Sequence, residues 1–123
     1  MKKKVDIKWL SEPADKDYPQ AESFLLLFYK AKVAGALIKK LKHAEMSKFA
    51  AKDILRASET LIAEVHAFDW VEQKREIQQG TPLSPLLLVR QDNGRHLIVA
   101  DGFHRLCAAF ATDQDVTVPC KIV

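Results

Sequence analysis

The sequence predicts an α+β fold, with a small mixed β-sheet covered by helices, in one domain over residues 1–123. Apolar residues recur at helical spacing through residues 1–45, and short apolar runs bounded by turn residues mark the later part of the chain. Of the 123 residues, 48% are hydrophobic and 28% charged, which is typical of a globular domain with one core. We therefore expect a mainly helical part at 1–45 and an α/β core at 46–123.

The first elements expected are an extended segment and the start of a helix. Val5, Ile7 and Trp9 alternate with polar residues, which indicates a short strand or an extended arm. Asp17 then offers a helix cap, and Pro19 is a residue that the first helical turn tolerates. A helix is therefore expected to begin near Asp17.

Two apolar stripes at helical spacing follow and are both assigned to the core. The first consists of Phe24, Leu27, Phe28 and Ala31, and the second of Ala34, Leu37, Ile38 and Leu41. Either two helices are separated near Gly35 or the Tyr29-Lys30 region, or one kinked helix carries both stripes. Both alternatives stay open from the sequence alone.

The middle of the chain predicts two more helices. A short helix is expected at 51–57, with a strand at 47–50 as an option before it. A further helix is expected at 68–79, ended by Gly80 as a C-cap and prevented from continuing by Pro82.

Three short runs predict the strands of the sheet. Leu86–Arg90 contains a continuous apolar run suited to burial on both faces. Asp92-Asn93-Gly94 is a turn signal before His96–Ala100, so these two strands are expected to form a hairpin. Thr117–Ile122 is expected as the last strand of the same sheet.

The sequence Asp-Gly-Phe-His-Arg at 101–105 follows the second of these strands and begins a helix. Free N–H groups at a helix N-terminus favour anions, so the amides of Phe103 to Arg105 are expected to open onto a polar cleft. Arg105 adds a bidentate donor for phosphate or carboxylate, and His104 adds a donor that titrates near neutral pH. Gly102 permits the turn. Asp101 either caps the helix or, turned outward, acts as a base or metal ligand.

This motif, with the apolar strand before it and Val116–Pro119 after it, resembles the ParB/sulfiredoxin-like superfamily over the C-terminal third to half of the chain. More widely, four segments resemble a group of short bacterial ParB-like proteins: Asp17-Tyr18-Pro19, Lys52–Ser58, Leu83-Ser84-Pro85 and Pro119-Cys120. The resemblance implies a ParB/sulfiredoxin-like fold and a phosphate-binding site at the start of the motif helix.

Departures from the better-known branches of the superfamily restrict the activity implied. Phe103 stands where sulfiredoxins have their catalytic cysteine, so repair of cysteine sulfinic acids is not expected. Partition-type ParB proteins have a glutamate there, so the resemblance does not carry over CTP hydrolysis. The motif is closer to the free-serine kinase branch, which implies a phosphate site lined by Asp101, Gly102, His104 and Arg105. Asp101 and His104 are then the catalytic candidates.

Lys52, Asp53 and Arg56 also resemble family-typical residues, and we expect Lys52 and Arg56 to bind phosphate at the border of the same cleft. Asp53 and Arg56 equally fit a surface ion pair, because they are three residues apart on a predicted helix. The four histidines and two cysteines show no metal-ligand spacing, so no protein metal site is expected. The cofactor implied is a nucleotide with Mg²⁺.

Composition sets the expected partners and compartment. The net charge of +3 is a mild bias toward anionic partners. No apolar run approaches the ~20 residues that span a bilayer, and Lys2–Lys4 is not followed by the apolar region of a signal peptide. We therefore expect a cytoplasmic protein without a membrane partner, with Cys107 and Cys120 as reduced core residues.

These features predict a phosphate- or nucleotide-binding domain, and they leave open whether it catalyses phosphoryl transfer or nucleotide hydrolysis. The alternative is a DNA-associated or regulatory interaction module without catalysis. Specific DNA binding by this chain alone is not expected, because no helix-turn-helix region follows the last strand before Val123. The sequence does not indicate the oligomeric state.

Overall fold

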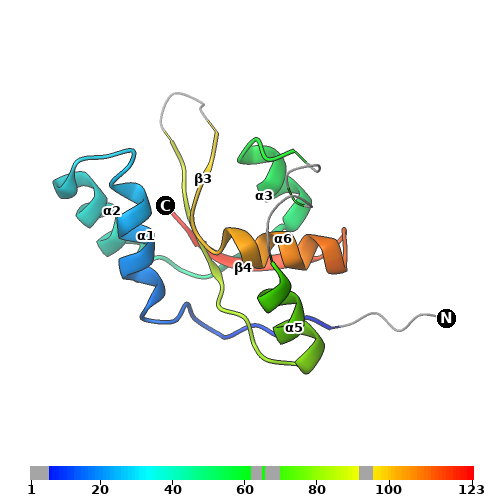
Figure 1. Cartoon of the computed structure of the whole chain (residues 1–123). Helices are drawn as coiled ribbons and strands as arrows, with labels where there is room; N and C mark the ends of the chain where they lie inside the picture. The colour runs from blue at the N-terminus through cyan, green and yellow to red at the C-terminus, as the bar shows by residue number, and fades with distance from the viewer. Residues whose placement is uncertain (1–5, 62–64, 66–69, 92–95) are drawn as a thin grey trace.

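The computed structural model describes residues 6–61, 65, 70–91 and 96–123 (Figure 1). Its elements, in chain order, are α1 (Asp17–Leu25), α2 (Ala31–His43), β1 (Ser47–Ala50), α3 (Ala51–Ala57), α5 (Val71–Gln79), β2 (Leu86–Val89), β3 (Ile98–Asp101), α6 (Phe103–Thr112) and β4 (Thr117–Ile122). The predicted mixed α+β fold is confirmed.

The four strands form one mixed sheet in the order β1-β4-β2-β3. The β2 strand pairs with β4 in parallel and with β3 antiparallel, and β1 pairs with β4 antiparallel. All four residues of β2 are buried, as expected for an apolar run covered on both faces. The antiparallel pairing of β2 with β3 is the pairing predicted for the two strands of the hairpin. The predicted turn at 92–94 lies outside the described residues.

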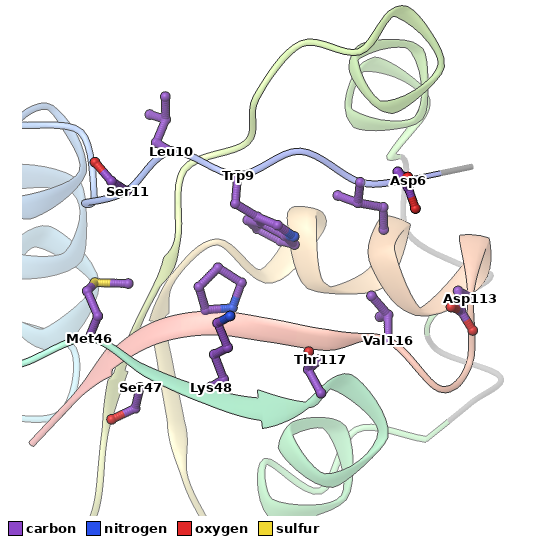
Figure 2. Close-up of a pocket in the computed structure, with 12 residues that line it drawn as sticks. Asp6, Trp9, Leu10, Ser11, Met46, Ser47, Lys48, Asp113, Val116 and Thr117 are labelled. Atoms are coloured by element: carbon purple, nitrogen blue, oxygen red, sulfur yellow. The ribbon is translucent and has the colours of Figure 1, made fainter. Parts of the chain in front are cut away.

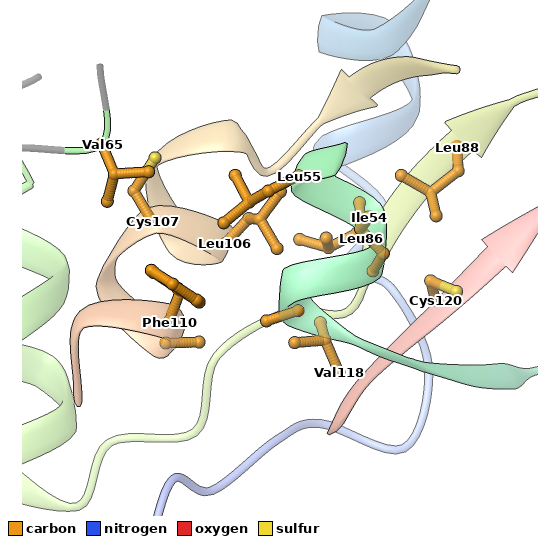
Figure 3. Packing of buried hydrophobic residues seen from close by; sticks show 12 residues of the cluster. Ile54, Leu55, Val65, Leu86, Leu88, Leu106, Cys107, Phe110, Val118 and Cys120 are labelled. Carbon is orange, nitrogen blue, oxygen red and sulfur yellow. The ribbon is translucent and has the colours of Figure 1, made fainter. Parts of the chain in front are cut away.

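Helices cover both faces of the sheet. Leu87 and Val89 of β2 face the cluster formed with α1 and α2, whereas Leu86 and Leu88 face the cluster formed with α3 and α6. Figure 3 shows this second cluster, to which α3 contributes Ile54 and Leu55, α6 contributes Leu106, Cys107 and Phe110, and β4 contributes Val118 and Cys120. The alternation along β2 therefore divides the core into two halves. The cover comes from both halves of the chain, with α1, α2 and α3 from the first half and α6 from the second.

Two separate helices carry the N-terminal part, joined by a corner at residues 26–30, while Gly35 lies inside α2. The second apolar stripe is half-buried or buried, as predicted. The assignment of the first stripe to the core is wrong: Leu27 and Phe28 are 78% and 48% exposed. Burial in α1 follows Tyr18, Ala21 and Leu25 instead, because the helix ends at Leu25 and the chain turns before the first stripe completes a helical face.

Asp17 does not cap α1. The N-cap is Lys16, which makes no side-chain capping bond, and Asp17 lies in the first turn with its carboxylate buried. That carboxylate accepts a hydrogen bond from the Ser84 hydroxyl instead of pairing with the N–H groups of the first turn. Gly80, in contrast, adopts the predicted left-handed conformation after α5, with φ 74°.

The described part of the N-terminal segment is an extended arm, which was one of the two expected alternatives. Trp9 forms an isolated parallel bridge with Leu83, and the Leu10 and Leu83 N–H groups donate to the carbonyls of Leu83 and Lys8 at 2.8 Å each. Within the described residues, no helix has the length and apolar character needed to cross a bilayer.

Candidate functional site

The junction between β3 and α6 depends on Gly102. Its φ of 99° lies in the left-handed region, and it forms the N-cap of α6 without a side-chain capping bond. A Cβ here would collide with Leu86 and lie 2.8 Å from Nη2 of Arg105. The turn therefore requires glycine both for its backbone conformation and for space. Asp101 does not cap the helix.

Arg105 lies in a buried ionic cluster. Its Nη2 donates to Asp101 Oδ2 at 2.8 Å, and Asp17 Oδ2 and the Pro85 carbonyl lie 3.5 Å from the same nitrogen. The Asp17 side chain is 1% exposed and that of Arg105 is 18% exposed. The expectation that Arg105 faces a polar cleft is therefore wrong. Its guanidinium lies between two carboxyl groups, and Arg105 lines none of the cavities described below.

The cluster is incompletely satisfied and has an excess of acidic groups. Asp17 Oδ1 and Arg105 Nε are buried and find no hydrogen-bond partner in the described part of the chain. Burial raises the pKa of Asp101, although the Arg105 hydrogen bond and charge oppose that effect. With two carboxyl groups for one guanidinium, these side chains do not supply the positive charge that a phosphate needs.

A cavity of about 520 Å³ lies along β3 and ends at the start of α6; we call it the β3 cleft. It is lined by Gln20, Phe24, Phe28, Ser58, Thr60, His96, Leu97, Ile98, Val99, Ala100, Asp101, Gly102 and Phe103. Asp101, Gly102 and Phe103 of the predicted site are thus brought together here. None of these described lining residues is a lysine or arginine, and His96 lies 3.4 Å from the Glu59 carboxylate.

A second cavity of about 740 Å³, the α3 cleft, holds the other two predicted phosphate ligands. Lys52 and Arg56 line it with Asp53, Leu55, Thr60, Leu61 and Phe110. Thr60 lines both clefts, and the hydroxyls of Ser58 and Thr60 are hydrogen-bonded at 3.0 Å. The ion pairs of Arg56 with Asp53 (3.5 Å) and of Lys52 with Asp115 (3.9 Å) are exposed. Thr60 is therefore shared by an apolar cleft and a cleft that carries two cationic side chains.

His104 lies elsewhere. It is exposed and lines a cavity of about 510 Å³ with Val71, Glu72, Gln73 and Arg75 of α5, whereas Asp101 lines the β3 cleft. The structure does not bring the two catalytic candidates into one cleft, because Asp101 ends β3 whereas His104 lies in the first turn of α6 beside residues of α5.

Sequence reasoning missed the aromatic and hydroxyl residues of the β3 cleft. Phe24 and Phe28 were assigned to the core, yet their rings lie 5.4 Å apart and both side chains are exposed at the cleft. Ser58 and Thr60 follow α3. Ser58 ends the Lys52–Ser58 segment of the resemblance, and no sequence signal indicated Thr60 as a site residue.

A fourth cavity, of about 690 Å³, lies between the N-terminal segment and the β1–β4 pair (Figure 2). The Trp9 indole points into it from one wall, and Lys48 projects from β1 on the other. It contains none of the predicted site residues. Across the described ranges, no group of three His, Cys, Asp or Glu side chains is placed to hold a metal ion.

No protein-family model, no curated protein and no solved structure matches this chain. The ParB/sulfiredoxin-like resemblance therefore stays a prediction. The fold is established as a four-stranded mixed sheet with helices on both faces.

Proposed function

We propose that this chain is a nucleotide-binding module that places the base in the β3 cleft and the phosphates in the α3 cleft. The observation that supports this most directly is the sharing of Thr60 between an aromatic cleft and a basic one. A nucleotide has the same division, with an aromatic base at one end, hydroxyl groups in the middle and phosphates at the other end.

The β3 cleft suits an aromatic base. Phe24, Phe28 and Phe103 supply aromatic faces, and stacking on such faces is tolerant of base identity. β3 is the last strand of the sheet, so no described strand covers its outer edge, and backbone groups there are able to pair with the polar edge of a base. The cavity volume of about 520 Å³ falls within the usual range for small-molecule sites.

The α3 cleft suits phosphates. The side chains of Lys52 and Arg56 are 59% and 86% exposed, so their ion pairs with Asp115 and Asp53 are screened by water and are readily exchanged for a phosphate. Arginine offers paired donors to phosphate oxygens, and lysine adds a point charge. Asp53 is the carboxylate of this cleft that would contact a phosphate-bound Mg²⁺, which typically uses one or two protein carboxylates.

The geometry favours binding over catalysis. Asp101 accepts a hydrogen bond from Arg105, and His104 lies in a different cavity, so neither candidate reaches the α3 cleft where the phosphates are proposed to lie. This arrangement agrees with the regulatory alternative rather than with phosphoryl transfer. We also infer a reducing compartment such as the cytoplasm, since both cysteines are free thiols.

Isothermal titration with a nucleoside triphosphate, the matching nucleoside and inorganic phosphate tests the proposal, each with and without Mg²⁺. The Lys52→Ala/Arg56→Ala variant is expected to bind the triphosphate about tenfold or more weakly, because it loses charge-assisted hydrogen bonds, while its nucleoside affinity is unchanged. Phe103→Ala is expected to weaken both. Lys39→Ala/Lys40→Ala removes the same charge from α2 and serves as the control. Absence of triphosphate binding, or equal losses in the control, would refute the proposal.

A further inference from the structure

Exposed apolar side chains are concentrated at the corner between α1 and α2. Nine large apolar residues are exposed in the described part of the chain, and five of them lie between positions 24 and 33. They are Phe24, Leu26, Leu27, Phe28 and Val33, with exposed fractions of 40 to 78%. Contiguous exposed apolar surface of this kind marks an interaction site. We call Leu26, Leu27, Phe28 and Val33 the apolar corner.

These side chains are not needed to hold the helices on the sheet. Leu25, Ala34 and Leu41, which are fully buried, supply that contact from the opposite side of the two helices. Figure 1 shows α1 and α2 together at one side of the molecule, away from α5. The apolar corner therefore belongs to an outward-facing surface.

The backbone N–H groups of residues 26–29 are paired locally. The N–H groups of Leu26 and Leu27 donate to the carbonyls of Glu22 and Phe24 at 3.0 and 3.1 Å, and those of Phe28 and Tyr29 both donate to the Leu25 carbonyl at 2.9 Å. Donors that are already paired lose no hydrogen bond to water when the segment moves into the headgroup boundary, which lowers the cost of peripheral binding.

Two exposed lysines lie beside the corner, and the nearest carboxylate of α1, Glu22, is half-buried. The two lysines are Lys30 and Lys32, and α2 carries four lysines and one histidine but no carboxylate. A second copy of this surface would bring like charges together, which opposes self-association through the corner. Nucleic acid would use the lysines but gains little from Leu26, Leu27 and Val33, because aliphatic side chains do not stack on bases as aromatic rings do.

We propose that the apolar corner binds the surface of an anionic lipid bilayer. Leu26, Leu27, Phe28 and Val33 enter the boundary between headgroups and acyl chains, and Lys30 and Lys32 contact anionic headgroups. The sequence-based expectation of no membrane partner rested on the lack of a spanning segment, which does not bear on peripheral binding. Of the apolar corner only Phe28 also lines the β3 cleft, and the variants below leave Phe28 in place, so a loss of lipid binding is distinguishable from a loss of nucleotide binding.

Co-sedimentation with vesicles tests the inference, comparing pure phosphatidylcholine with phosphatidylcholine containing about 30% phosphatidylglycerol. The whole chain is expected to bind only the anionic vesicles, and less as salt rises. Leu26→Ser/Leu27→Ser should lower the bound fraction about tenfold, and Lys30→Gln/Lys32→Gln should lower it severalfold. Val71→Ser removes an exposed apolar residue from α5 and should leave binding unchanged.

Three results would overturn the inference. The first is equal sedimentation with and without anionic vesicles. The second is vesicle binding that Leu26→Ser/Leu27→Ser leaves intact. The third is a lipid-free dimer, detected by sedimentation velocity, that the same variant dissociates, because the corner would then be covered by a second copy. Circular dichroism of each variant confirms that a loss of binding is not a loss of folding.

Discussion

The Arg105 guanidinium lies 2.8 Å from the Asp101 carboxylate, four residues earlier in the chain and on the far side of the Gly102 turn. The same guanidinium lies 3.5 Å from the buried carboxylate of Asp17 in α1. One side chain therefore connects the end of β3, the start of α6 and the first turn of α1. We infer that the Asp-Gly-Phe-His-Arg motif stabilises this junction through Arg105.

Replacing Arg105 by methionine should destabilise the protein by about 3 kcal/mol, because it leaves two carboxyl groups in a buried site without their counter-ion. Urea unfolding followed by tryptophan fluorescence measures the change. Arg56→Met is the matched control, since its pair with Asp53 is exposed and contributes less than about 0.5 kcal/mol. Equal stability of the two variants would show that the Arg105 cluster has no structural role.

Stability should depend on pH through Asp101. Burial raises the pKa of this carboxyl above its ordinary value of 3.8, so the folded state binds the proton more tightly than the unfolded state. Asp101 therefore contributes stability below pH 3.8, and that contribution is lost as the pH rises through the raised pKa. The free energy of unfolding of the wild type, relative to Asp101→Asn, should fall as the pH rises from acid to neutral. A constant difference, or one that grows with pH, would contradict this assignment.

Gly102→Ala should cost about 2–4 kcal/mol. The new Cβ would meet Leu86 and the Arg105 guanidinium, and the φ of 99° is strained for any residue with a side chain. Gly35→Ala provides the opposite case, because the nearest atom to its new Cβ is 3.6 Å away and α2 would gain helix propensity of about 0.5–1 kcal/mol. Thermal unfolding of both variants should shift in opposite directions; equal shifts would contradict this account of the turn.

Neither cysteine should react readily in the folded protein. Cys107 and Cys120 are fully buried, and burial raises the pKa of each thiol to about 11. Modification by a disulfide reagent at about pH 8 should be on the order of a hundredfold slower than after unfolding in urea, since the thiolate is the reactive species. Rapid labelling of the native protein would show that one thiol is accessible. Such labelling would reopen the question of cysteine chemistry near Phe103.

Much of the fold could be predicted from local patterns. The run Leu86–Val89 predicted burial on both faces, and both cysteines were predicted to lie in the core; all of these residues are buried. The strand order could not be predicted, because the parallel pairing of β2 with β4 joins segments more than 30 residues apart and no local pattern specifies it. The prediction that the first apolar stripe lies in the core failed for a related reason. Whether these side chains are buried depends on the residue at which α1 ends, and the local pattern does not specify that residue.

The site was less predictable than the fold. The motif correctly located a turn and a helix start, whereas the cleft at this turn is apolar rather than polar. The environment of Arg105 depends on Asp17, which is 88 residues away in sequence. A sequence motif cannot show that the guanidinium of Arg105 is already paired with a carboxylate from a distant part of the chain. Lys52 and Arg56 were expected beside the motif and instead line the neighbouring cleft, with Thr60 as the shared residue.

Amide chemical-shift mapping during titration with a nucleoside triphosphate tests the proposed site most directly. The account predicts that the largest shifts occur at Arg56, Thr60, Gly102 and Phe103, which line the two clefts. The Trp9 indole, in the cavity of Figure 2, should stay unchanged. Shifts centred on Trp9 and Lys48, or no shifts at any of these residues, would contradict the proposal that a nucleotide binds across the β3 and α3 clefts.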